Sequence, residues 1–309
     1  MLPSTLLHQL APTTADPRPV LLAVAGPTAV GKTALTVRLA QQLGTEILSA
    51  DSRQFYREMC IGTARPTPAE MQDVPHHFIG SHSIAEDYSA GRYAADALGL
   101  LDSLFKSYPV VLATGGSGLY LQALTDGLDE LPTVPPQVRQ QLLHELATLG
   151  LPALVAELAR LDPVAHQRLD LQNHQRVVRA LEITRGTGQP FSSFHRGPAA
   201  AAEAAARRSF RVVKVALTRP REELYQRIDQ RVLQMLDEGL VAEARDLLPF
   251  RQHNALQTVG YQELFGYFDG HYDYTEAVRL LQRNTRHYAK RQLTWLRRDA
   301  AYQWVELSN

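Results

Sequence analysis

The residue types best suited to chemistry stand together in one glycine-rich segment, residues 26–33. This segment, Gly-Pro-Thr-Ala-Val-Gly-Lys-Thr, fits the phosphate-binding pattern Gly-x-x-x-x-Gly-Lys-[Ser/Thr] at every fixed position. The backbone N–H groups of such a loop, and the helix N-terminus behind it, direct partial positive charge at a phosphate. Lys32 adds a full charge, and the Thr33 hydroxyl can ligate Mg²⁺. The residues predicted to bind the phosphate group are Gly26, Thr28, Ala29, Val30, Gly31, Lys32 and Thr33.

The flanking sequence supplies the elements that this loop needs. Residues 20–25 are apolar throughout, as in a buried strand, and residues 34–43 carry leucines four positions apart, as in a helix. A second predicted strand, residues 45–51, ends on Asp51. Because ligands bind beyond the carboxyl ends of parallel strands, we expect Asp51 to lie near the phosphate loop. An aspartate can also cap a helix or a turn, and the sequence leaves that alternative open.

A second unit of strand, glycine-rich turn and helix follows in residues 109–124. Its tip residues Gly115, Gly116 and Ser117 are expected to face the same crevice as the phosphate loop. The strand ends in Thr114, whereas a Walker B strand of a P-loop ATPase would end in aspartate. This difference argues against a standard ATPase.

The composition limits the classes of protein that the chain can belong to. Among 309 residues, 32 basic and 32 acidic side chains balance, so any nucleic-acid surface must be local. The single cysteine, Cys60, excludes an internal disulfide and a zinc site of paired cysteines, and it fits a reducing cytoplasm. No apolar run reaches the roughly 18–20 residues of a membrane span. Residues 1–17 lack the features of a secretion signal and are expected to be mostly disordered.

These patterns predict an α/β fold with a P-loop NTPase-like parallel sheet flanked by helices and a helical insertion domain. Residues 18–124 and 208–309 are expected to form the P-loop domain. Residues 125–207 are expected to form the insertion, because helical patterns follow a proline-rich junction there without a buried strand. Its alanine-rich end, residues 198–206, is typical of a mobile loop or a weak helix extension.

Two pairs of arginines lie on single faces of predicted helices. Arg176 and Arg179 are three residues apart, a spacing that most often belongs to a solvated face. Arg227 and Arg231 are four apart on the helix that follows the strand at 210–217. By fold-level analogy with small P-loop kinases, such a helix supplies arginines to the phosphates.

The terminal helix, about residues 275–298, carries seven basic residues against one acid in residues 276–298, with aromatic residues between them. A basic stripe follows it at spacings of four, three and four, formed by Arg279, Arg283, Arg286 and Lys290. Such a stripe on a neutral protein is either a footprint for a nucleic-acid backbone or a solvated helix face.

Taken together, these segments resemble the bacterial tRNA dimethylallyltransferases, also called tRNA isopentenyltransferases. The resemblance spans roughly residues 20 to 305. Besides residues 26–33, the segments that carry it are Ser49-Ala-Asp-Ser-Arg-Gln, Ile61-Gly-Thr-Ala-Arg-Pro, Gly115-Gly-Ser-Gly-Leu-Tyr, Gln175-Arg-Val-Val-Arg-Ala-Leu-Glu, Val259-Gly-Tyr-Gln-Glu and Tyr288-Ala-Lys-Arg-Gln-Leu-Thr-Trp-Leu-Arg.

The resemblance implies transfer of a dimethylallyl group from dimethylallyl diphosphate to the exocyclic N6 of adenosine 37, just 3′ of the anticodon of tRNA. It implies that the loop holds a diphosphate and that Asp51 is the general base. Lys32, Thr33, Mg²⁺ and Arg231 would stabilise the departing diphosphate. Ser117 would help to hold the adenine and the base carboxylate. A reacting adenine must leave its stack, as base-flipping enzymes require.

The resemblance also implies a set of contacts with the anticodon stem-loop of tRNA. By this match the tRNA-binding residues are Asp51, Ser52, Arg53, Gln54, Ser117, Arg139, Gln175, Arg176, Val177, Val178, Arg179, Gly260 and Tyr261. The helical insertion would then be the tRNA-binding domain of a cytoplasmic monomer. Three positions depart from the family pattern: Ser117 replaces a common threonine, and Cys60 and Gly80 each replace a common aspartate.

Two other functions fit parts of the sequence. A small-molecule or nucleotide kinase could use the same loop, and it would need to bind ATP tightly. A non-catalytic RNA-binding protein could retain the loop as a structural relic, although the intact Lys32, Thr33 and Asp51 argue against that.

Overall fold

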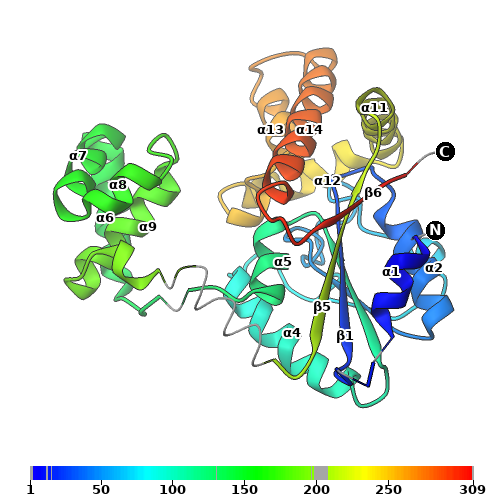
Figure 1. The fold of residues 1–309 in the computed structure, drawn as a ribbon. Coiled ribbons are helices and arrows are strands. Elements are labelled where there is room, and N and C mark those ends of the chain that lie inside the picture. The colour runs from blue at the N-terminus through cyan, green and yellow to red at the C-terminus, as the bar shows by residue number, and fades with distance from the viewer. Residues whose placement is uncertain are drawn as a thin grey trace. The chain divides into compact units, whose positions relative to one another are not determined.

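The computed structural model describes residues 3–11, 13–14, 16–129, 131–195, 197 and 208–307, and it confirms the predicted parallel α/β sheet. Six strands pair in the order β3-β2-β4-β1-β5-β6, and every pair is parallel (Figure 1). The strands are β1 Val20–Ala25, β2 Ile47–Ser49, β3 His76–His77, β4 Val110–Gly115, β5 Arg211–Thr218 and β6 Gln303–Glu306. The alanine-rich segment 198–206 lies outside the described residues.

Helices join the strands and cover both faces of the sheet, as crossover connections between parallel strands require. Those in the sheet-containing part of the chain are α1 Ser4–Leu10, α2 Lys32–Leu43, α3 Pro68–Met71, α4 Ala90–Leu104, α5 Gly118–Thr125, α11 Arg221–Asp237, α12 Leu240–Leu247, α13 Tyr261–Phe268 and α14 Tyr274–Leu296. Short 3₁₀ turns lie at η2 Leu248–Phe250 and η3 Asn254–Leu256. None of the helices in the described ranges is both long and apolar enough to cross a membrane.

The side chains of β1 show why this strand is central. All six of its residues are buried, and they alternate between two hydrophobic cores. Val20, Leu22 and Val24 pack with residues of α2 and α11, whereas Leu21, Ala23 and Ala25 pack with residues of α4 and α5. The buried strand β1 therefore fixes the position at which the phosphate loop begins.

The chain divides into two compact units, one built from the sequence before residue 126 and after residue 207, and one from residues 126–207. The second unit contains α6 Pro136–Leu149, α7 Leu151–Leu161, α8 Pro163–Arg168, α9 His174–Thr187 and η1 Phe191–Phe194. It has a hydrophobic core of its own, to which α6, α7 and α9 contribute Leu142, Leu154 and Leu181. Whether this unit binds tRNA stays a prediction.

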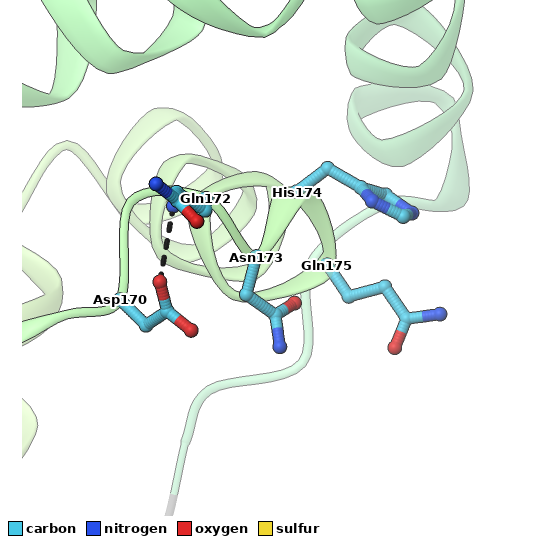
Figure 2. A pocket seen from close by; sticks show the side chains of 5 residues that line it. All are labelled: Asp170, Gln172, Asn173, His174 and Gln175. Carbon is cyan, nitrogen blue, oxygen red and sulfur yellow. Dashed lines mark hydrogen bonds between the residues drawn. The ribbon is translucent and has the colours of Figure 1, made fainter. Parts of the chain in front are cut away.

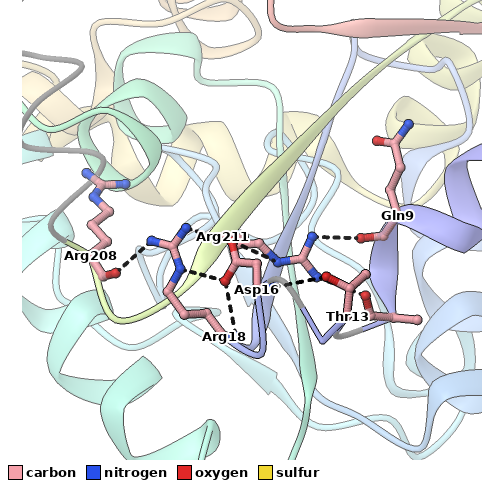
Figure 3. Close-up of polar contacts among 7 residues, drawn as sticks. Gln9, Thr13, Asp16, Arg18, Arg208 and Arg211 are labelled. Carbon is pink, nitrogen blue, oxygen red and sulfur yellow. Dashed lines mark hydrogen bonds and ion pairs between the residues drawn. The ribbon is translucent and has the colours of Figure 1, made fainter.

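Within the N-terminal segment expected to be disordered, the structure corrects the prediction for helix α1. Leu6 and Leu10 are spaced by one helical turn, and both are buried in the core beside β1. Arg211 of β5 donates hydrogen bonds to the carbonyl oxygens of Gln9 and Ala11, and Asp16 pairs with Arg18 (Figure 3). The sequence of residues 1–17 alone does not indicate this packing, because the residues that contact α1 come from distant parts of the chain.

Candidate active site

The phosphate loop follows β1 and ends where α2 begins at Lys32, as the sequence pattern predicts. Two residues adopt left-handed backbone angles, Ala29 with φ 63° and Gly31 with φ 108°. Gly26 sits so close to its surroundings that an added Cβ would lie 3.0 Å from Val30 Cγ1. The loop thus has the tight curvature that brings successive N–H groups toward one anion.

The Lys32 side chain is folded back over this loop. Its Nζ donates hydrogen bonds to the carbonyl oxygens of Gly26 and Pro27, each at 2.9 Å. Burial lowers the pKa of Lys32 to about 8, with Asp51 opposing the shift and Arg231 adding to it. The Lys32 ammonium group therefore interacts electrostatically with the side chains of Asp51 and Arg231. A bound anion would stabilise its charged form.

Three arginines surround the loop on the side of β5 and α11. Arg219 Nε donates to the carbonyl oxygen of Val30 at 2.9 Å, and Arg227 Nε donates to that of Ala29 at 2.8 Å. Burial lowers the pKa of Arg231, which lies one turn beyond Arg227 on α11. Within the described part of the chain, the Arg231 guanidinium has no hydrogen bond or ion pair, so it could pair with an anion bound at the loop.

The turn after β4 meets the segment after β2, because β2 and β4 are neighbours in the sheet. The Ser52 N–H donates to Ser117 Oγ at 2.9 Å, and the Ser117 hydroxyl donates to Ser52 Oγ at 2.9 Å. An added Cβ on Gly115 would lie 2.3 Å from the carbonyl oxygen of Ala50, so only glycine permits this approach. Asp51 Oδ1 accepts the Arg53 N–H at 3.2 Å.

The structure therefore brings Lys32, Asp51, Ser117 and Arg231 to one end of the sheet. It also adds Tyr288 of α14, which sequence reasoning did not select. Burial raises the pKa of Tyr288, and the nearby Asp51 carboxylate raises it further, whereas Ser117 acts in the opposite direction. In the sequence, Tyr288 was marked only as the first residue of the Tyr288-Ala-Lys-Arg-Gln segment of the family resemblance and as an aromatic residue in the basic terminal helix.

Several residues predicted to contact RNA have hydrogen-bond partners within the protein, and their contact with RNA stays a prediction. Gln54 Nε2 donates to the carbonyl oxygens of Thr63 and Ala64, which closes the loop after β2. Tyr261 is fully buried, and its hydroxyl donates to Glu243 Oε1 at 2.7 Å. The same carboxylate accepts the three N–H groups of residues 60–62. Gly260 has φ 106° and its N–H is capped by Glu263.

In the second unit, the Gln175–Arg179 segment forms the start of α9. Val177 and Val178 are buried in the core of this unit, whereas Gln175 and Arg176 are exposed. Arg139 of α6 and Arg179 each lie 3.0 Å from the Glu182 carboxylate. A pocket of about 410 Å³ lies beside the α9 N-terminus. Its lining residues, drawn in Figure 2, are Asp170, Gln172, Asn173, His174 and Gln175.

The residues present fit a Mg²⁺ ion that is held mainly by its substrate. The Thr33 hydroxyl lies in the first turn of α2, where P-loops place a metal ligand. Across the ranges that the structure describes, no cluster of three or more His, Cys, Asp or Glu side chains is found. Mg²⁺ commonly binds through few protein ligands plus substrate phosphates and waters, and the Thr33 hydroxyl could supply one such ligand.

The parallel sheet carries a P-loop after its central strand β1, a carboxylate after β2 and a serine after β4. This arrangement defines an enzyme of the P-loop transferase type. The chain belongs to the IPP transferase family, whose model matches residues 54–299. It is 49% identical to the tRNA dimethylallyltransferase of Cytophaga hutchinsonii over 92% of this chain and 91% of that protein. It is 50% identical to tRNA dimethylallyltransferase 1 of Porphyromonas gingivalis, over 92% of this chain and 93% of that protein.

Solved structures agree with this assignment. The full-length tRNA isopentenylpyrophosphate transferase of Bacillus halodurans superposes with a TM-score of 0.68 at 37% identity, over 94% of this chain and 90% of that one. A eukaryotic dimethylallyltransferase described as acting on tRNA superposes with a TM-score of 0.72, over 93% of this chain and 74% of that one. Because its identity is 22%, that second likeness speaks for the fold alone.

Proposed function

We propose that this enzyme transfers a dimethylallyl group from dimethylallyl diphosphate to N6 of adenosine 37 in tRNA, giving N6-dimethylallyladenosine and diphosphate. The observation that carries the proposal is the meeting of a cationic phosphate loop with Asp51 and Ser117 at one end of the sheet. One side of this site suits a diphosphate leaving group, and the other offers a carboxylate to an amine.

In the proposed reaction, the N6 lone pair forms a bond to C1 of the dimethylallyl group. The C1–O bond breaks, and its electron pair leaves with the diphosphate. The proton that N6 loses passes to the Asp51 carboxylate, whose Oδ1 is oriented by the Arg53 N–H. Ser117, which joins the two segments that flank the site, would hold the adenine beside that carboxylate.

Negative charge builds up on the diphosphate as the C1–O bond breaks. Lys32, the loop N–H groups and the Arg231 guanidinium are cations or donors already in place, so little reorganisation is needed when that charge develops. Bound Mg²⁺ would add a further positive charge at the diphosphate, with the Thr33 hydroxyl as its protein ligand. Burial of Lys32 strengthens its attraction for the leaving group, because water screens it less.

The same site speaks against the kinase alternative. The residue at the Walker B position, Thr114, donates its hydroxyl to the carbonyl oxygen of Val24 at 3.2 Å, so it braces β1. A P-loop kinase holds the metal of its nucleotide with a carboxylate at this place. We therefore expect calorimetry to show tighter binding of dimethylallyl diphosphate than of ATP.

The proposed RNA-binding groups lie on α14 and in the second unit. On the basic stripe, Arg279 pairs with Glu276 and Arg286 pairs with Asp229, which leaves Arg283 and Lys290 as its more available cations. In the second unit, Gln175 and Arg176 are exposed at the start of α9. We propose that these groups contact the anticodon stem-loop. We also propose that the enzyme acts as a cytoplasmic monomer, and sedimentation of the purified protein would test its monomeric state.

The test is incubation of an anticodon stem-loop RNA with the protein, dimethylallyl diphosphate and Mg²⁺, without ATP. Mass spectrometry of the released nucleosides should reveal N6-dimethylallyladenosine. A matched RNA with guanosine in place of the target adenosine serves as the control and should remain unmodified. RNA binding without any modification would instead favour the non-catalytic alternative and would overturn the proposal.

A further inference from the structure

The side chain of Gln292 connects the phosphate loop to the turn that carries Ser117. Its Oε1 accepts the backbone N–H of Thr28 at 2.9 Å, and its Nε2 donates to the carbonyl oxygen of Gly116 at 2.9 Å. Gln292 belongs to α14 and is only 7% exposed. The two partners also define the orientation of the amide, because an N–H group can only donate and a carbonyl can only accept.

These two hydrogen bonds of Gln292 lie just beyond the last paired residues of β1 and β4, the strands that lead into the two loops. The pairing of β1 with β4 ends at Ala25 opposite Gly115, so Thr28 and Gly116 receive no support from that ladder. Helix α14 packs directly against the same turn, since an added Cβ on Gly118 would lie 2.2 Å from Trp295 Cδ1. The Gln292 side chain therefore joins the two loops across the site.

We propose that Gln292 is a positioning residue that sets the distance between the diphosphate loop and the Asp51–Ser117 side of the site. This inference rests on the proposed function, in which the leaving group is held by one loop and the adenine by the other. Transfer requires the two reacting atoms to approach closely and in line, and a small misplacement costs much of the rate. Gln292 acts through the backbone of both loops, so its loss should lower kcat more than substrate affinity.

The first test is Gln292→Met, which keeps the length of the side chain and removes both hydrogen bonds. We expect kcat to fall roughly 10- to 100-fold while KM for dimethylallyl diphosphate and for the stem-loop RNA changes much less. The matched control is Gln282→Met on the same helix, whose amide makes one hydrogen bond within the described residues, to the Asp229 carbonyl oxygen at 3.5 Å. That control should stay within about twofold of wild type, as is usual for a substitution away from the site.

The second test disrupts the hydrogen bonds of Gln292 from the Gly116 side. An added Cβ on Gly116 would lie 2.3 Å from Gln292 Nε2, and the end of that flexible side chain would have to move. Gly116→Ala should therefore reproduce the fall in kcat, whereas Gly99→Ala in α4, with open space around it, should not. The double variant Gln292→Met with Gly116→Ala should be about as slow as either single variant, because both remove one interaction.

Rates are compared per folded molecule, counted from the stoichiometry of stem-loop RNA binding. A substitution that merely unfolds part of the sample would lower that count and leave the corrected kcat unchanged. The inference is overturned if the corrected kcat of Gln292→Met matches that of Gln282→Met, or if the costs of Gln292→Met and Gly116→Ala simply multiply. Wild-type protein that fails to modify the RNA would overturn the proposed function instead, so the two failures are separate.

Discussion

The hydroxyl of Ser117 lies 2.9 Å from both the backbone nitrogen and the hydroxyl oxygen of Ser52, and it joins the turn after β4 to the segment after β2. Ser117→Ala removes both hydrogen bonds, and we expect kcat to fall roughly tenfold or more, since each is typically worth about 0.5–1.5 kcal/mol. Ser117→Thr retains the hydroxyl and should keep most of the activity. Equal rates for the alanine and threonine variants in single-turnover assays would show that the hydroxyl is dispensable.

The carboxylate of Asp51 is the proposed acceptor of the N6 proton. Asp51→Asn keeps the size of the side chain but cannot accept that proton, so we expect kcat to fall roughly 10²–10⁴-fold, the usual worth of a general base. Binding of the stem-loop RNA, measured by fluorescence anisotropy, should be retained. Turnover within about tenfold of wild type would argue that Asp51 is not the base.

Lys32 makes the affinity for diphosphate depend on pH. Its pKa is lowered by burial to about 8, so the free enzyme loses this charge as the pH rises through that value. We expect the calorimetric affinity for inorganic diphosphate to fall over the same range. Lys32→Arg keeps its charge there and should show a weaker dependence on pH. Parallel pH profiles for wild type and Lys32→Arg would contradict this role.

The same pKa shift affects the stability of the free enzyme. Because the folded pKa lies below the unfolded value of 10.5, the unfolded state binds more protons between about pH 8 and 10.5. The contribution of Lys32 to the free energy of unfolding should therefore rise with pH across that window. Denaturant titrations of wild type and Lys32→Met at several pH values would measure it, and the free energy of unfolding of wild type should increase relative to that of Lys32→Met as the pH rises from about 8 to 10.5.

Tyr261 distinguishes a structural role from an RNA-binding role. Its buried hydroxyl donates to Glu243, which also holds the N–H groups of residues 60–62. Tyr261→Phe should therefore lower the free energy of unfolding by about 1 kcal/mol, the typical worth of one hydrogen bond. Affinity for the stem-loop RNA should change little. A large loss of RNA affinity at unchanged stability would instead support the RNA contact implied by the family resemblance.

Helix α1 offers a matched pair of leucines. Leu6 is 3% exposed and Leu7 is 41% exposed, so only the first contributes to the core. Leu6→Ala should lower the free energy of unfolding by about 2–3 kcal/mol, at the lower end of buried leucine truncations, whereas Leu7→Ala should cost well under 1 kcal/mol. Similar urea midpoints for the two variants would show that α1 adds little to stability.

The amino-acid sequence by itself determined the parallel α/β sheet, the phosphate loop and the placement of Asp51 and Ser117. These features follow from local patterns: an apolar run sets a buried strand, glycines permit tight turns, and parallel strands deliver their ends to one edge of the sheet. Spacing also placed Arg227 and Arg231 on one helix face, whereas their role at the phosphates came from analogy with P-loop kinases and from the family resemblance.

Only the tertiary structure decided which side chains act together across the chain. Gln292 and Tyr288 lie more than 170 residues from Gly116 and Ser117 in sequence, and no local pattern marks their contact. The Tyr261–Glu243 hydrogen bond and the burial of the N-terminal leucines were not predicted for the same reason, because both depend on partners that the chain folds against these residues. Local pattern therefore placed the chemical groups of the site, and long-range packing determined how they are held relative to one another.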